Sequence, residues 1–304
     1  MTSSQTWAAA RPTTNDPELG PFLRLHPLQP SQLPAHTDLV ITDGSTRPRL
    51  AEFVKAVLDE AITFATSVLP NKFHVKSENK SASPASASVQ LLAHEVDSVL
   101  PAAQGATSGK PLVENWFARI SKHENAAKDG TATWEEFDAG LRQDHSQHEM
   151  DYTPEVKDAH LVVDYRAELA SLQDSFGEWQ DVHAEIREML HQLPMPLEKR
   201  VFSVLVVSAK KAGEFIDVQL PLDLSGVSKA KYVDAPSITE GIYVSIEYGK
   251  LIDDGARVEW RMATASDAKG NLPMWAQKLG VPGAVVKDVG LFMDWRMRER
   301  NNRS

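Results

Sequence analysis

The chain has 304 residues, of which 42% are hydrophobic and 24% are charged, a balance that allows one large domain or two smaller ones. Its formal net charge of -10 argues against nucleic-acid binding, because neutralising phosphates requires clustered lysines and arginines. The absence of cysteine excludes disulfides, thiolate metal sites and cysteine nucleophiles. The chain shows neither an apolar run of membrane-spanning length nor the apolar core of a signal peptide. We therefore expect a cytoplasmic protein.

The N-terminal third divides into three segments. Residues 1–47 are polar and rich in proline, which predicts a loose segment. Residues 48–70 carry apolar side chains at helical spacing between Phe53 and Val68 and end at a proline, which predicts a helix. Residues 71–110 are rich in serine, alanine and lysine, which predicts a flexible low-complexity linker, in which residues 89–100 could form a short helix.

The pattern of residues 111–300 predicts one domain that begins with a strand. A helix is predicted after Thr133, because Glu136 three residues later completes a capping box. Residues 159–168 read as a second strand, whereas residues 178–194 fit a helix and a strand equally well. Further strands without intervening helices indicate an antiparallel sheet, whose apolar face a long last helix must cover. These strands are expected over residues 201–210, 213–222, 241–252 and 256–264.

Two stretches in this domain resemble START-type lipid-transfer domains. The first is a strand with an internal tryptophan, then a turn into the final helix: Trp260, Asp267, Lys269, Gly270, Leu272 and Pro273. The second is a proline-rich turn followed by an arginine and an aromatic residue that opens a central strand: Pro194, Pro196, Arg200 and Phe202. More narrowly, residues 113–300 resemble a fungal START-like family of unknown function within the helix-grip superfamily that includes the birch-pollen allergen.

The resemblance implies an α+β helix-grip fold, in which a curved antiparallel sheet wraps around a long C-terminal helix, here with an extra N-terminal helix. It also implies a monomer that binds or transfers one hydrophobic ligand, such as a lipid or sterol, without a cofactor and with transient membrane contact. Several sterol-handling relatives carry a second arginine six residues after the strand-opening one. Val206 occupies that position here, so this ligand anchor is missing.

Candidate cavity residues follow from the expected strands and the last helix. They are Trp116, Arg119, Tyr165, Phe202, Val206, Tyr243, Glu247, Trp260, Met262, Val285, Val289 and Phe292. The alternative for each is ordinary core packing, which is the commoner role of aromatic and helix-stripe residues.

Two segments are candidates for gating the cavity. The first is the long loop 222–240, with Val227 and Tyr232 as residues that touch a membrane. The second is an interruption of the last helix at Gly280, Pro282 and Gly283. The alternatives are an ordinary long loop and a kink that follows the curvature of the sheet.

Other chemistry was weighed against this interpretation. His145, His148 and Glu149 fall within one helical turn, but two histidines on a charged helix are usually solvated, and we predict no metal site. A cyclase- or hydrolase-like enzyme on the same fold is the alternative function, with His160, Tyr165 or Glu247 as acid or base. A third class is a scaffold that uses residues 1–110 for docking.

Overall fold

The computed structural model describes residues 13–14, 19–39, 46–99, 111–193, 197–270, 272 and 274–303. The strands in these ranges form one sheet in the order β1-β3-β4-β10-β9-β8-β7-β6-β5, and β2 pairs with β3. All neighbours are antiparallel except for a short parallel contact between β7 and β9. The strands are β1 (Thr13–Thr14), β2 (His74–Lys80), β3 (Val89–Val99), β4 (Pro111–Glu124), β5 (Val156–Asp164), β6 (Gln180–His191), β7 (Lys199–Lys211), β8 (Glu214–Pro221), β9 (Ile238–Ile252) and β10 (Arg257–Asp267).

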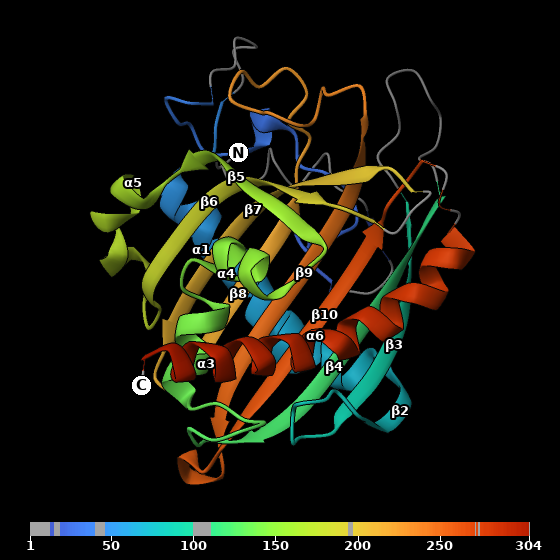
Figure 1. Ribbon diagram of the computed structural model, residues 1–304. Helices are drawn as coiled ribbons and strands as arrows, with labels where there is room; N and C mark the ends of the chain where they lie inside the picture. The colour runs from blue at the N-terminus through green and yellow to red at the C-terminus, as the bar shows by residue number, and fades with distance from the viewer. Residues whose placement is uncertain are drawn as a thin grey trace.

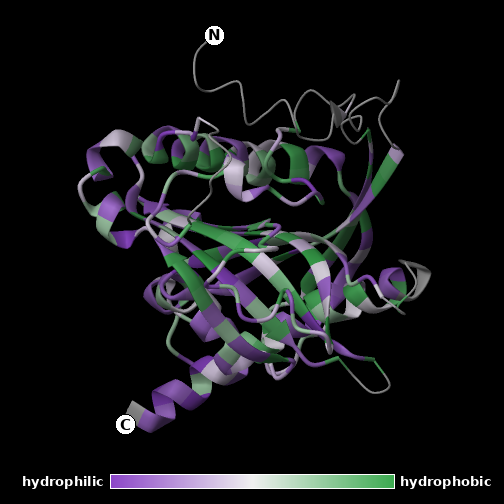
Figure 2. Ribbon diagram, turned by 90° about the horizontal axis from the view of Figure 1, so that it is seen from above, coloured by the Kyte–Doolittle hydropathy of each residue, from purple (hydrophilic) through white to green (hydrophobic). Residues whose placement is uncertain are grey.

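Helices cover the sheet on both faces (Figures 1 and 2). One face packs against α1 (Leu50–Thr63), which continues through a π-helical turn η4 (Phe64–Val68) into α2 (Leu69–Lys72). The concave face holds α6 (Met274–Arg303), which crosses the strands in Figure 1, together with α3 (Trp134–Leu141) and α4 (His145–Tyr152). Short turns complete the chain: η3 (Pro30–Gln32), α5 (Arg166–Ala170), η5 (Gln173–Phe176) and η6 (Asp253–Gly255). The expected α+β helix-grip architecture, with its extra N-terminal helix, is confirmed.

The low-complexity segment contributes two strands to this sheet. β3 pairs residue by residue with β4, from Val89 opposite Ser121 to Val99 opposite Pro111, and β2 pairs with β3. The expectation of a flexible linker over residues 71–110 is therefore wrong for residues 74–80 and 89–99. The side chains of β2 are almost all exposed, so this edge strand lacks the apolar alternation by which strands are recognised. Residues 100–110 lie outside the described residues.

The N-terminal segment is packed rather than loose where it is described. Phe22, Leu23, Leu28 and Leu33 are buried in the core beneath α1, which corrects the expectation for residues 19–39 of the segment 1–47. Prolines exclude a helix here, but they do not prevent extended chain from packing on a sheet. Residues 1–12, 15–18 and 40–45 lie outside the described part.

A buried ion pair fastens this segment to the sheet. The Arg24 guanidinium contacts the Glu114 carboxylate at 2.7 Å, and both side chains are almost fully buried. The Glu114 carboxylate also accepts from the Leu25 backbone at 3.1 Å and from the Trp116 indole at 3.3 Å. Because several donors converge on one buried carboxylate, removing its charge leaves an uncompensated arginine in the core.

The remaining elements refine the sequence predictions. The capping box of Thr133 and Glu136 is present, but the helix ends at Leu141 and a new one starts at His145, with Asp144 in the left-handed region (φ 45°) between them. Residues 180–191, which the pattern left open, form β6 because they pair with β5 and β7. α6 is continuous through Pro282, so the expected interruption is wrong as secondary structure.

The motif that carries the START resemblance forms the junction between β10 and α6. The Arg200 guanidinium donates from Nε to the Ala268 carbonyl at 2.7 Å. Lys269 and Gly270 both have positive φ, and the Asp267 carboxylate accepts from the Lys269 backbone at 2.9 Å. The junction fixes the start of α6 relative to the sheet, while Pro194, Pro196 and Pro273 lie outside the described residues.

Replacing Glu114 by glutamine should destabilise the fold strongly. The change leaves Arg24 charged and buried without its counter-ion, which costs about 3–5 kcal/mol in comparable cases. Urea unfolding measures the change in the free energy of unfolding. The matched control is Glu124→Gln on the same strand, whose carboxylate forms an exposed pair with Lys128 and should matter by less than about 1 kcal/mol. Equal, small effects of the two substitutions would contradict the prediction.

Candidate functional site

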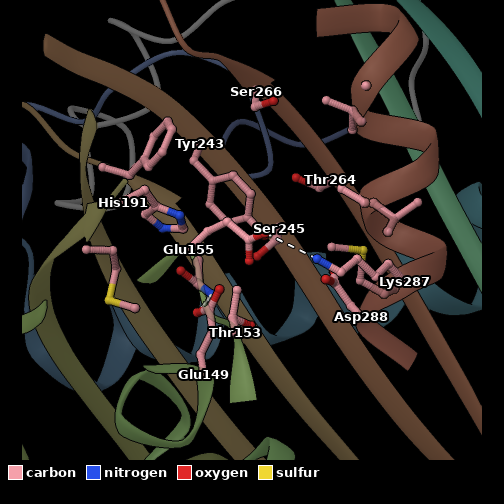
Figure 3. A pocket seen from close by; sticks show the side chains of 18 of the residues that line it. Glu149, Thr153, Glu155, His191, Tyr243, Ser245, Thr264, Ser266, Lys287 and Asp288 are labelled. Atoms are coloured by element: carbon pink, nitrogen blue, oxygen red, sulfur yellow. Dashed lines mark hydrogen bonds and ion pairs between the residues drawn. The ribbon is translucent and has the colours of Figure 1, made fainter. Parts of the chain in front are cut away.

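A cavity of about 530 Å³ lies between the concave face of the sheet and α6. Strands β4, β6, β7, β8, β9 and β10 supply one wall, and the N-terminal half of α6 supplies the opposite wall. α4 and the turn before β5 complete the lining, and the volume is that of an ordinary small-molecule site. Figure 3 shows part of this lining, with Tyr243 and Thr264 on the strands and Asp288 on the helix.

The structure brings most of the predicted lining together. Seven of the predicted residues line the cavity: Arg119, Phe202, Tyr243, Glu247, Trp260, Met262 and Val285. On β9 and β10 they occupy alternate positions, as residues that share one face of a sheet must.

Trp116 and Tyr165 do not reach the cavity. Trp116 packs under the π-helical turn, with its ring 5.0 Å from that of Phe64, and Tyr165 donates its hydroxyl to the Pro34 carbonyl at 3.0 Å. Trp116 and Arg119 are three residues apart on one regular strand, so they face opposite sides of the sheet. The prediction that both line one cavity is therefore wrong.

Three further candidates face the α6 side without lining the cavity. Val289 and Phe292 are fully buried and pack the C-terminal half of α6 against the sheet, where Phe292 stacks on Phe137 at 5.4 Å between ring centroids. Val206 packs with Phe202 and Met189. Their role is core packing.

Of the gating candidates, only Gly280 lines the cavity. Val227 packs on the core beneath α1, and Tyr232 donates its hydroxyl to Asp158. The loop 222–240 is further held because the Glu188 carboxylate accepts from the backbone of residues 231, 232 and 233. The structure therefore places this loop away from the cavity, and Pro282 and Gly283 outside its lining.

A buried arginine forms the polar floor of the cavity. Arg119 on β4 contacts Glu247 on β9 at 3.2 Å and lies over the Trp260 ring at 3.8 Å. The Trp260 indole donates to the second oxygen of Glu247. Burial raises the pKa of Glu247, although the Arg119 charge and the indole hydrogen bond oppose this. An arginine–carboxylate pair thus exists in the cavity, but on strands other than the one that carries Val206.

His145 forms a second polar group beside it. Its Nδ1 lies 2.6 Å from the Leu141 carbonyl, and its Nε2 lies 3.0 Å from the Gln219 amide nitrogen and 3.7 Å from both Glu149 and Asp217. Burial disfavours the charged imidazole, but these two carboxylates and the carbonyl outweigh it and raise its pKa to about 9. Burial also raises the pKa of Asp217 to about 7. The surrounding carboxylates therefore favour the charged form of His145.

The helix wall of the cavity carries Lys287 and Asp288. The Lys287 ammonium reaches Glu155, before β5, at 3.2 Å, so an ion pair joins the two walls (Figure 3). Asp288 points toward the same space. Burial, together with the nearby Glu149, Glu247 and Glu155, raises the pKa of Asp288 to about 7, although the Arg119 charge opposes this.

Sequence reasoning missed His145, Gln219 and Asp288. The sequence predicts a solvated His145, because it predicts one charged helix that continues from Thr133 through this residue. The break at residues 142–144 redirects α4, so that His145 faces the sheet. Among the described residues, no group of three or more histidines and acids is placed to hold a metal ion. None of the helices described combines the length and apolar character that a membrane span requires.

The sheet, the gripped helix and the cavity between them define a START-like helix-grip fold. The chain belongs to the family described as "Protein of unknown function (DUF3074)", which matches residues 116–296. Human STARD10 has a similar fold, with a TM-score of 0.51 and 9% identity over 88% of this chain and 84% of that one. Human StAR-related lipid transfer protein 5 gives a TM-score of 0.50 and 11% identity over 82% and 97%. A search of curated proteins gives no match.

The raised pKa of His145 predicts how stability depends on pH. A histidine whose pKa rises on folding stabilises the fold fully below its unfolded pKa, and this contribution is lost as pH rises toward about 9. Thermal unfolding of the wild type should therefore show a midpoint that falls between pH 7 and 9. The fall should be smaller in His145→Gln and unchanged in His74→Gln, which alters an exposed histidine. An unchanged slope in His145→Gln would contradict the assignment.

Proposed function

We propose that the protein binds or transfers one hydrophobic small molecule or lipid, without catalysis, in the cavity between the sheet and α6. The observation that supports it is the cavity itself, a largely apolar volume of about 530 Å³ that opens to solvent along α6, where Gly280, Ala284 and Lys287 are exposed. Clefts of this size that are lined mainly by apolar side chains are the usual form of small-molecule sites.

The position of the cavity follows from the side chains of α6. Its N-terminal half presents small residues to the sheet, Gly280, Val281 and Ala284, whereas its C-terminal half presents Phe292 and Met293. The large residues fill the space beneath the helix, and the small ones leave it open. A ligand that occupies the open half gains about 25 cal/mol for each Å² of apolar surface removed from water.

The remaining parts of the proposal concern where the protein acts. We infer a cytoplasmic monomer that takes its ligand from a membrane during transient contact. Leu279 supports such contact, because it is 76% exposed on α6 directly beside the cavity residue Gly280. The acidic net charge of -10 is consistent with partners other than nucleic acids.

Native mass spectrometry of the purified protein tests the proposal. We expect a fraction of the protein to carry one molecule, or to acquire one after incubation with liposomes and lipid extracts, and solvent extraction would identify it. A clean mass that remains unchanged after these incubations would contradict the binding function.

A substitution that fills the cavity should abolish binding. Ala284→Trp places an indole in the space beneath α6, so ligand uptake should fall at least tenfold while the protein stays folded. The matched control is Gly283→Trp, at the preceding position of the same helix, which is exposed, has open space around an added side chain and lies outside the lining. Uptake that is lost equally in both variants, or in neither, would place the ligand elsewhere.

A second function, acid–base catalysis on a bound molecule, is favoured by one observation. The cavity contains a histidine and a carboxylate with strongly shifted pKa values, His145 and Asp288, as active sites often do. Of the residues predicted for this role, only Glu247 lies there, because His160 bonds the Lys229 carbonyl and Tyr165 faces α1. Mass analysis of the bound molecule before and after incubation tests it, since catalysis changes the mass or isomer and binding does not.

A further inference from the structure

The cavity has more acidic groups than basic ones. Five carboxylates among the described residues lie in its lining or directly behind His145: Glu149, Glu155, Asp217, Glu247 and Asp288. Three basic side chains balance them in part: Arg119, His145 and Lys287. Burial lowers the pKa of His191, the other histidine of the lining, so it is neutral and does not add to the positive charge.

The basic groups are already engaged with specific acids. Arg119 pairs with Glu247 at 3.2 Å, and Lys287 pairs with Glu155 at 3.2 Å. His145 lies 3.7 Å from both Glu149 and Asp217. Asp288 is left without a hydrogen bond or ion pair to any described residue, although it is half-buried and faces the cavity (Figure 3).

A second observation shows that the polar floor is incomplete. Arg119 is 1% exposed and lines the cavity, yet its Nε and Nη1 have no hydrogen-bond partner among the described residues. Buried polar atoms are nearly always hydrogen-bonded in folded proteins, so unpartnered donors on an arginine that lines a cavity indicate that a bound molecule completes them.

The aromatic lining favours a cation over an anion. Tyr243, Phe202 and Tyr152 present rings to the cavity, and an aromatic face attracts a positive charge within about 6 Å of its centroid. Above pH 7, where Asp217 and Asp288 are mostly ionised, an anionic ligand would meet the repulsion of the more numerous carboxylates. A cationic ligand would reduce this repulsion.

The volume restricts the apolar part of the ligand. A cavity of about 530 Å³ has the volume of sites that take one drug-sized molecule. One aliphatic chain with a small polar end is a ligand of this kind.

We propose that the cavity takes a single-chain amphiphile whose polar end is a protonated amine seated against Asp288, with a neighbouring hydroxyl oxygen that accepts from Arg119. A long-chain amino alcohol has this chemistry. The inference rests on the proposed binding function and names the ligand class for that same site. The chain lies along the apolar wall formed by Phe202, Met262 and Val285.

Binding of probes with one shared twelve-carbon tail tests the proposal. By titration calorimetry on the full chain at pH 8, 2-aminododecan-1-ol should bind most tightly, followed by dodecylamine. Dodecan-1-ol should bind at least tenfold more weakly than dodecylamine, and dodecanoate more weakly still. Dodecanol or dodecanoate that binds as tightly as the amine would overturn the assignment of a cation while sustaining hydrophobic binding. Equal affinities of dodecylamine and 2-aminododecan-1-ol would overturn the proposed hydrogen bond from Arg119 to the ligand hydroxyl.

Substitution of Asp288 distinguishes the effect of its charge on ligand preference from an effect on folding. Asp288→Asn should reduce the preference for dodecylamine over dodecanol at least tenfold and leave dodecanol binding unchanged, which also shows that the variant is folded. The control Asp294→Asn alters an exposed carboxylate on the same helix, paired with Arg298, and should keep the preference. A preference that survives in Asp288→Asn would overturn the proposal. Absence of binding by every probe to the wild type would instead contradict the proposed function itself.

The pH dependence provides a further readout. The charged groups that face Asp288 are Glu149 on α4, Glu155 before β5, Arg119 on β4, Glu247 on β9 and the neighbouring Lys287. Because the Asp288 pKa is about 7, dodecylamine affinity should rise about tenfold from pH 6 to pH 8 as this carboxyl ionises. Dodecanol affinity should not change, and the rise should be lost in Asp288→Asn. A rise retained in that variant would overturn the role of Asp288.

Discussion

Side chains alternate between the two faces of one sheet, and in this protein both faces are covered. The residues of β9 show the consequence: Val244, Ile246 and Tyr248 pack beneath α1, whereas Tyr243 and Glu247 face α6. The molecule therefore has two interiors that share one wall. One is filled by the N-terminal segment and α1, and the other contains the cavity. Each feature of the cavity depends on which residues of a strand face which interior.

This constraint explains what could be predicted from sequence and what could not. Strands with both faces buried, such as β7, appear in the sequence as continuous apolar runs. Such a run predicts that a strand is present, but it does not show which side chains point to which face of the sheet. Trp116 and Arg119 were both expected at the cavity, although an odd spacing on one strand prevents it. The exposed edge strand β2 could not be predicted for the opposite reason, because too few of its side chains are buried to produce an apolar pattern. The presence of β2 and the facing of β7 both depend on pairing with neighbouring strands, which a local sequence pattern does not show.

The polar groups of the cavity show a second limit of prediction from sequence, which concerns residues that are far apart in the chain. Val206 correctly signals that one known position for a buried arginine is empty, but it says nothing of other positions. Arg119 and Glu247 are far apart in the chain and meet only because β10 lies between β4 and β9 and carries Trp260 beside them. His145 joins them because the turn of residues 142–144, in which Asp144 is left-handed, separates α3 from α4 and directs α4 toward the sheet. Such convergence is a property of topology rather than of any motif.

The last helix shows how composition alone can shape a cavity. Pro282 lacks the amide hydrogen that would bond the Lys278 carbonyl, and Gly280 and Gly283 are weak helix formers, yet α6 continues through them. The compensation comes from its two anchored ends. Gln277 accepts from the Ala268 backbone at 2.8 Å near the start, and the Arg300 guanidinium bonds Glu136 near the end. Because the ends hold the helix in place, its middle does not need large side chains for contact with the sheet. Small residues there keep the space beneath the helix open, and Phe292 and Met293 close it one to two turns beyond Lys287.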